Sequence, residues 1–246
     1  MRYHILASGS KGNCTVISDE ETTIVIDAGT TNRHLKASFL EIDVDYKDVD
    51  GVLITHTHSD HIGRINLFNK SQFYTPEYLG EKFNQIELYG NDSFQINSLR
   101  IKTIPLSHDK GLTLGYIIEN AKSKLVYITD TGYFKDSHID LIKDADYYIM
   151  ESNHDPQMLM ETNRPFFLKQ RIMAMDGHLC NMDAAEVLSK VVSNKTKEVT
   201  LAHLSEEANC PDLAVKTTIN KLNNKEIKIR AAKQFEIVSG GEYAKK

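Results

Sequence analysis

Residues 55–61 read Thr-His-Thr-His-Ser-Asp-His and place four side chains able to bind a metal within six residues. The segment follows the apolar run at residues 51–54, whose length and composition predict a buried strand. The polar residues would then lie at the C-terminal end of that strand, where sites of layered α/β folds form. Three imidazoles with one carboxylate favour zinc, manganese or iron, because calcium and magnesium prefer oxygen ligands. The pattern indicates a hydrolase site for two metal ions, with a solvated polar loop as the alternative.

Two ions need more ligands than one loop supplies, and three other residues stand at the ends of strand-like runs. His108 follows shortly after the apolar stretch 99–106, while Asp130 and His203 each end a short apolar run. A single strand-end Asp or His is more often a turn or cap residue. The same placement occurs three times, however, and this recurrence favours metal ligands.

The spacing assigns the candidate ligands to two ions. Alternate residues of an extended segment share one side, so His56 and His58 can face the same ion, while Asp60 and His61 lie on the turn beyond. We therefore expect one ion to be held by His56, His58 and His108, the other by Asp60, His61 and His203, and both to be bridged by Asp130 opposite a shared water.

This ligand set and its order along the chain resemble the metallo-β-lactamase superfamily. The resemblance spans nearly the whole chain and implies an α/β fold, a four-layer αββα sandwich with two divalent metal ions. Only about seventy residues separate Asp130 from His203, too few for the large extra domain of the β-CASP nucleases. A recessed clamp for long RNA is therefore not expected.

Length and composition bound the organisation of the chain. The 246 residues, 41% of them hydrophobic, suit one large or two small domains. Because the candidate ligands run from His56 to His203, we expect a single domain over residues 1–246. No apolar run of 18 residues occurs, and residues 1–3 lead directly into strand-like sequence, so we expect neither a membrane span nor a signal peptide. Three cysteines without C-x-x-C spacing indicate reduced thiols in the cytoplasm. The net charge of −5 excludes a basic DNA-coating protein.

Hydrophobic periodicity predicts many short strands and a few helices. The clearest helical pattern covers residues 181–192, with Ala184, Ala185 and Leu188 on one face. Further helices are expected at 33–40, 137–143 and 213–222. Strands are expected at 1–6, 14–18, 23–27, 51–54, around Phe94, and at 99–104, 112–119, 125–129, 145–150, 226–230 and 234–238.

Two segments without predicted metal ligands are similar to the transfer-RNA 3′-processing nucleases of the superfamily. Glu151 follows a predicted strand, and Gly177-His178 precedes a helix that carries Ala-Ala. In those nucleases a Glu and a His form an acid pair that protonates the leaving oxygen, and the resemblance assigns Glu151 and His178 to these catalytic roles. The alternative is a buried strand-end carboxylate and a residue at a helix N-terminus.

Several motifs resemble the bacterial YycJ (WalJ) family more closely. They are Leu-Ala-Ser-Gly-Ser-Lys-Gly-Asn at 6–13, Thr-Asp-Thr-Gly-Tyr at 129–133, Glu-Ser-Asn-His-Asp at 151–155, Gly-His-Leu at 177–179 followed by Asn181, and Ala-His-Leu-Ser at 202–205. The resemblance implies a DNA exonuclease that acts from 5′ ends and is associated with DNA repair. The pattern of this family predicts Ser at position 180, and Cys180 departs from it.

The predicted chemistry is hydrolysis of a phosphodiester. Two cations about 3.5 to 4 Å apart lower the pKa of a shared water towards roughly 7 and so supply hydroxide for in-line attack at phosphorus. Asp60 would orient that water, and imidazolium His178, supported by Glu151, would protonate the leaving oxygen. For substrate binding we expect His154 to contact phosphate, and Lys169 and Arg171 to contact the DNA backbone, with a solvated surface as the alternative.

Two other functions remain open at this stage. The same site could hydrolyse a small thioester, lactone or cyclic phosphodiester, which would suit the acidic surface. The chain could also be a non-catalytic binding protein on a hydrolase scaffold, although every expected ligand is present. The sequence leaves open the physiological metal, DNA versus RNA, end polarity, oligomeric state and pathway.

Overall fold

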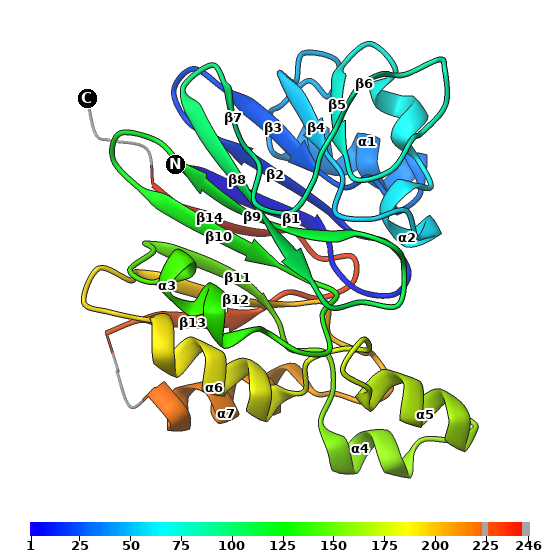
Figure 1. Ribbon diagram of the computed structural model, residues 1–246, viewed down its shortest axis with the longest axis vertical. Coiled ribbons are helices and arrows are strands. Elements are labelled where there is room, and N and C mark those ends of the chain that lie inside the picture. The colour runs from blue at the N-terminus through cyan, green and yellow to red at the C-terminus, as the bar shows by residue number, and fades with distance from the viewer. Residues whose placement is uncertain (223–225, 243–246) are drawn as a thin grey trace.

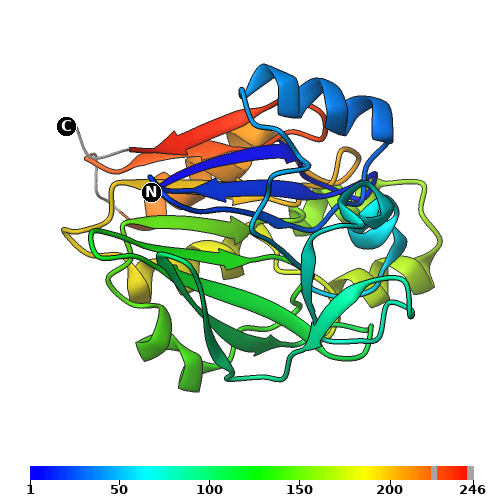
Figure 2. The same cartoon turned by 90° about the horizontal axis from the view of Figure 1, so that it is seen from above.

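Two stacked β-sheets form the centre of the protein, as the computed structural model in Figures 1 and 2 shows. The structure describes residues 1–222 and 226–242. Within those residues each sheet has seven strands. The first sheet has the order β14 (Val238–Gly241), β1 (Arg2–Ala7), β2 (Cys14–Ser18), β3 (Thr23–Ile26), β4 (Gly51–Leu53), β5 (Gln72–Thr75) and β6 (Asn84–Glu87). The second has the order β13 (Lys228–Ala231), β12 (Glu198–Ala202), β11 (Tyr147–Glu151), β10 (Lys124–Ile128), β9 (Thr113–Glu119), β8 (Leu99–Leu106) and β7 (Ser93–Ile96).

Helices cover the outer face of each sheet. Helix α1 (Asn32–Glu41) packs on the first sheet, whereas α3 (Ile139–Ile142), α6 (Asn181–Val191) and α7 (Pro211–Leu222) lie over the second (Figure 1). The short helices α2 (Ser59–Ile62), η1 (Ile65–Phe68) and η2 (Asp136–His138) belong to connections. Helices α4 (Pro156–Glu161) and α5 (Phe166–Met173) lie between β11 and α6 in the chain, at the lower right of Figure 1.

The alternation of side chains along each strand explains the four layers. In β3, Ile24 and Ile26 point between the sheets, and Val25 points towards α1. In β10, Leu125 packs between the sheets and Val126 packs under the helices of the second face. Because these strands are apolar on both faces, each sheet packs against the other sheet on one face and against helices on the other. This arrangement confirms the αββα sandwich expected from the sequence.

Most predicted elements are present, and two of them differ clearly from the prediction. The helix expected at residues 137–143 is split into η2 and α3, and the strand expected at 234–238 is displaced to Val238–Gly241. Two glycines in β14 make it a poor strand by composition, but the pairing of Gly240 with Tyr3 holds it in the first sheet. Strands β13 and β14 consequently belong to different sheets. Helices α4 and α5 were not expected, because each spans only two turns or so and carries no clear apolar period.

Candidate metal centre

The predicted metal ligands gather at one edge of the sandwich. They follow the C-terminal ends of strands: residues 56–61 after β4, His108 after β8, Asp130 after β10 and His203 after β12. Strands β10, β11 and β12 are parallel, so the residues that follow them leave the same edge of the second sheet. Residues separated by up to 147 positions in the chain, from His56 to His203, therefore lie close together at this edge.

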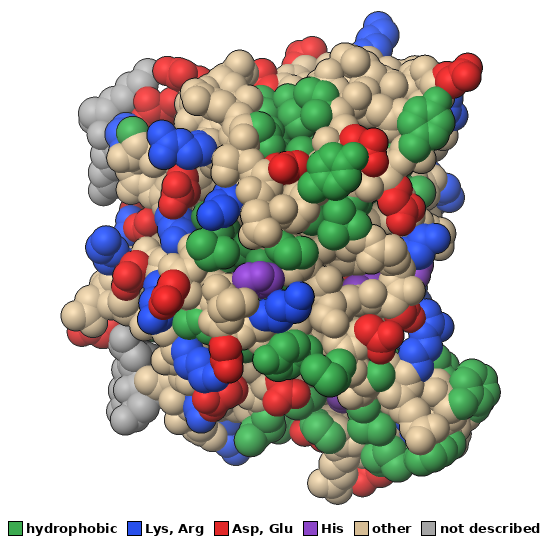
Figure 3. Space-filling model, in the orientation of Figure 1, with side chains coloured by type: hydrophobic (Ala, Val, Ile, Leu, Met, Phe, Trp, Pro, Cys, Tyr) green, Lys and Arg blue, Asp and Glu red, His purple; other side chains and the backbone are tan. Residues whose placement is uncertain are grey.

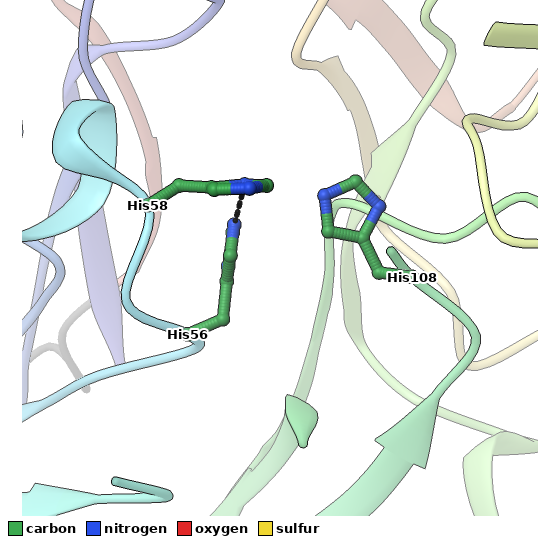
Figure 4. A group of neighbouring side chains, drawn as sticks. All are labelled: His56, His58 and His108. Atoms are coloured by element: carbon green, nitrogen blue, oxygen red, sulfur yellow. Dashed lines mark hydrogen bonds between the residues drawn. The ribbon is translucent and has the colours of Figure 1, made fainter. Parts of the chain in front are cut away.

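His56, His58 and His108 form the first group (Figure 4). His56 Nε2 lies 2.9 Å from His58 Nδ1. The ring of His108 lies 5.1 Å from that of His56 and 5.3 Å from that of His58, between centroids. One nitrogen from each ring lies within 4.8 Å of the others, which is compatible with a shared ion. The structure therefore brings together the three histidines expected to hold one metal.

Asp60, His61 and His203 form the second group, and Asp130 lies between the two. The Asp130 carboxylate has one oxygen 3.4 Å from His61 Nε2 and the other 3.1 Å from His203 Nδ1. It also lies 3.9 Å from His108 Nε2, a member of the first group. This central position is the one expected for a residue that bridges two ions.

The second nitrogen of several imidazoles is held by a hydrogen bond. His61 Nδ1 donates to Asp27 Oδ2 at 2.7 Å, and His108 Nδ1 donates to the carbonyl of Gly177 at 3.1 Å. His203 Nδ1 donates to Glu151 Oε1 at 3.1 Å. Such bonds orientate the rings and place a proton on Nδ1, as in many metal-binding histidines. The pattern is that of a ligand set orientated in advance.

Asp27 was not singled out from the sequence, and the structure places it directly behind the first metal loop. Its carboxylate is fully buried and accepts hydrogen bonds from His61 Nδ1, Thr55 N and Thr55 Oγ1. Its position at the end of a strand-like run was the available signal, the same signal that identified Asp130. The side-chain amide of Asn13 lies 2.9 Å from the other ring nitrogen of His61, Nε2.

The residues fit divalent cations on physical grounds. Asp130 Oδ2 is buried and has no hydrogen-bond partner among the described residues, which is costly unless a cation satisfies it. Burial opposes ionisation of Asp130, but His203 and His61 hold its pKa well below the usual range. Burial also opposes protonation of His61, yet the carboxylates of Asp130 and Asp27 raise its pKa to about 9. A site that combines imidazoles with carboxylates is suited to zinc, manganese or iron.

Unusual backbone conformations turn the ligands into the cleft. Asp27, Asp130 and His203 have φ values of 59°, 59° and 55°, a left-handed conformation that is uncommon for non-glycine residues. Each lies one or two residues after the end of a strand, so the turn redirects its side chain towards the site, and such strain is typical of functional sites. Gly29 permits a close approach in the same region, because a Cβ there would lie 1.4 Å from the carbonyl oxygen of Asp60.

Glu151 and His178 lie beside this centre as a bonded pair. His178 Nδ1 donates to Glu151 Oε1 at 2.8 Å, and Oε2 accepts from the backbone N–H groups of Thr131 and Leu179. Burial raises the pKa of Glu151, but the neighbouring His178 and His203 lower it to about 2. The ionised carboxylate orientates His178, whose ring lies 5.1 Å from His108 and 5.2 Å from His203. The arrangement is chemically capable of delivering a proton into the cleft.

Three sequence-predicted substrate contacts have different outcomes in the structure. His154 is only 2% exposed and is not among the residues lining the cleft, so the expectation that it contacts phosphate is not supported. Lys169 is also buried, and its ammonium group donates to the carbonyls of Met160 and Thr162 at 2.6 and 2.7 Å. Its charge therefore stabilises the α4–α5 turn instead of facing DNA. Arg171 does line the cleft, where it is paired with Asp109.

Cys180 also has a structural role. It is the N-cap of α6, where its Sγ accepts from the backbone N–H of Asp183 at 3.5 Å and donates to the Asp183 carboxylate at 3.2 Å. Serine is a preferred residue at such a position, so the thiol replaces the expected hydroxyl in the same capping function. All three cysteines are free.

No helix in the described part of the chain is long and apolar enough to cross a membrane.

Comparisons with known proteins agree with this geometry. A family described as β-lactamase superfamily domain matches residues 22–204. The exodeoxyribonuclease YycJ of Bacillus anthracis is 34% identical over 96% of this chain and 94% of its own length. The exodeoxyribonuclease WalJ of Streptococcus pneumoniae is 33% identical over 90% of this chain and 88% of its own.

Solved structures show the same fold at low identity. The metallo-β-lactamase fold protein YhfI of Bacillus subtilis has a TM-score of 0.74 at 15% identity, over 96% of this chain and 98% of that one. The short form of human tRNase Z has a TM-score of 0.65 at 15% identity, over 97% and 98% of the two chains. At this level of identity the likeness concerns the fold alone.

Proposed function

Because the chain belongs to the metallo-β-lactamase superfamily and to its YycJ/WalJ family, it is a metal-dependent hydrolase, and we propose that it degrades DNA from 5′ ends as an exonuclease. The observation that carries the chemistry is the Glu151–His178 pair, held by a 2.8 Å hydrogen bond beside both ligand groups. The choice of DNA is supported by relatives named exodeoxyribonucleases that match nearly the whole chain.

The proposed ligand sets are the two groups described above, with Asp130 between them. When bound, two divalent ions would polarise the phosphate and make a nearby water a stronger acid. Within this arrangement Asp60 is placed to accept a hydrogen bond from the attacking water. Its side chain is 27% exposed and reaches the cleft, and its Oδ2 lies 3.6 Å from His61 Nε2.

The leaving oxygen needs a proton, and His178 is placed to provide it. In the imidazolium form Nδ1–H donates to Glu151, and Nε2–H is the proton available to the cleft. His178 is partly exposed, with 21% of its side chain accessible, whereas Glu151 is fully buried. The carboxylate therefore holds the ring while the ring contacts the substrate, a division of roles typical of general acids.

We also propose that residues 1–246 act as one hydrolase domain. Support comes from the interface between the sheets, where Tyr3 and Ile24 of the first sheet pack in one cluster with Leu125 and Tyr147 of the second. The ligand groups themselves combine residues from both sheets. Division of the chain into independent halves would therefore separate the ligands.

The test is degradation of end-labelled DNA by the purified protein with manganese, magnesium or zinc. We expect stepwise loss of a 5′ label from linear DNA, and matched RNA oligonucleotides serve as the comparison. An intact 5′-labelled DNA under all three metals, together with efficient turnover of a thioester or lactone, would replace the nuclease proposal by a small-molecule hydrolase.

A further inference from the structure

Helix α5 forms one wall of the metal cleft. Leu168, Arg171 and Ile172 of this helix line the cleft, as does Arg164 in the turn before it. Residues three and four positions apart share one side of a helix, so this spacing gives α5 a defined cleft-facing side. The wall combines apolar surface with two guanidinium groups.

Phe167 stands next to that side and is 72% exposed. At about 100° per residue, Phe167 and Arg171 lie roughly 40° apart around the helix axis, and so they are surface neighbours. Phe166, which is 60% exposed, lies roughly 140° from Arg171 on the same scale and points away from the cleft side. Figure 3 shows hydrophobic side chains gathered at the lower right, over α4 and α5.

The guanidinium groups of Arg171 and Arg164 are held in place by carboxylates and still have N–H donors available. Arg171 pairs with Asp109, whose Oδ1 lies 3.5 Å from His108 Nε2, so the pair ties α5 to the first ligand group. Arg164 Nε donates to Glu207 at 2.9 Å. Each guanidinium has five N–H donors, so an ion pair with one carboxylate leaves N–H groups for phosphate oxygens.

We propose, on the basis of the function proposed above, that Phe167, Arg164 and Arg171 form a nucleotide-binding ledge for unpaired DNA at the entrance to the metal cleft. The exposed ring of Phe167 stacks on a base of the strand that enters the site, and the two arginines bind the flanking phosphates. An aromatic ring beside cations is the arrangement by which proteins bind single-stranded nucleic acid without sequence preference. Both faces of a base within a duplex are already covered by its neighbours, so the ledge recognises unpaired ends.

The experiment compares Phe167→Ala with wild type on an oligonucleotide duplex that carries a single-stranded 5′ end. Loss of one stacking contact should raise KM roughly 5- to 150-fold. Phe167→Trp should restore the wild-type KM. Phe166→Ala is the matched control, because it also removes an exposed ring, but from the other side of α5, and should leave KM unchanged. Turnover of a nitrophenyl phosphodiester, which has no base to stack, should be the same in all variants and confirms that they are folded.

A second substrate isolates the contact with the base. On an oligonucleotide whose 5′-terminal nucleotides lack bases, wild type and Phe167→Ala should have the same KM. A wild-type KM for Phe167→Ala on the normal end, or an equal penalty on the abasic end, would overturn the ledge.

The two proposals can fail separately. If the wild type degrades no DNA under any metal, the nuclease proposal fails. The oligonucleotide then stays intact, and its binding to wild type and Phe167→Ala is measured directly by fluorescence anisotropy. Weaker binding of the oligonucleotide by Phe167→Ala than by the wild type supports the ledge as a binding surface, whereas equal affinities overturn it.

Discussion

Replacement of Asp27 by Asn should weaken metal binding although Asp27 is not itself a proposed ligand. The carboxylate is fully buried, and its Oδ2 accepts from His61 Nδ1 at 2.7 Å and from Thr55 Oγ1 at 2.8 Å. Asparagine has nearly the same volume and tolerates the φ of 59° at this position. The substitution therefore removes the charge and one acceptor while it preserves the shape of the site.

The expected magnitude follows from the lost hydrogen bond. A bond to a charged group contributes about 1.5 to 3 kcal/mol. Since 1.4 kcal/mol corresponds to a factor of about ten, the dissociation constant of the metal bound through His61 should rise roughly 10- to 150-fold. This range overlaps the roughly 10- to 100-fold effect known for residues that support metal ligands.

The assay is competition for zinc between the protein and a chromophoric chelator. Asp144→Asn is the matched control, because Asp144 also has a left-handed φ, of 58°, and is exposed. It precedes the N-terminal end of β11, whereas the proposed ligands follow the C-terminal ends of strands. It should bind metal like the wild type. Activity of Asp27→Asn should return at high metal concentration, because the chemical groups that face the substrate are unchanged. An Asp27→Asn protein with wild-type zinc affinity would refute the reasoning that Asp27 orientates His61.

Three further predictions concern the metal ligands and the acid pair. Chelation of the metal should abolish activity. The variants His58→Ala and Asp130→Ala should lose bound metal, measured by metal analysis, together with turnover. Activity in a protein that holds less than half an equivalent of metal would contradict this prediction. His178→Ala should keep its metal and degrade DNA about 10²- to 10⁴-fold more slowly than the wild type. The loss should be smaller on a nitrophenyl phosphodiester, because its leaving group needs no proton. Equal losses on both substrates would exclude the acid role. Folding lowers the pKa of Glu151 from 4.5 to about 2, so its stabilising contribution to the metal-free protein should be present above pH 4.5 and be lost as the pH falls towards 2. Acid unfolding curves should show a weaker pH dependence for Glu151→Gln over that interval, and identical curves would contradict the assignment.

The local sequence was sufficient to identify the elements that carry the metal groups. The apolar run at 51–54 followed by closely spaced histidines predicted a strand and a ligand loop, and the structure has β4 followed by His56, His58 and His61. The same reasoning applied to Asp130, which follows β10. These predictions succeed because strand periodicity and strand-end positions are local properties, and ligands at strand ends converge when the strands are parallel.

The surroundings of those ligands depended on tertiary structure. Asp27 supports His61 from 34 positions away, and nothing local distinguishes it from an ordinary residue at a strand end. The positions of Lys169 and His154, both predicted to contact substrate, depend on tertiary structure for the same reason. Lys169 looks like a surface charge in the sequence, but two carbonyls at the end of α4 draw its ammonium group inward, and His154 is buried behind the cleft.

The sequence by itself determined the class of fold, the candidate ligand residues and their order, because these depend on hydrophobic alternation and on the chemistry of side chains close together in the chain. Only the tertiary structure decided which residues orientate the candidate ligands by hydrogen bonds, and which residues form the wall of the metal cleft. Helix α5 has no clear apolar period, yet packing turns Arg171 into the cleft beside Asp109 and leaves Phe167 in solvent next to it. The direction in which a side chain points depends on all the elements packed around it, and that information is spread over the whole chain.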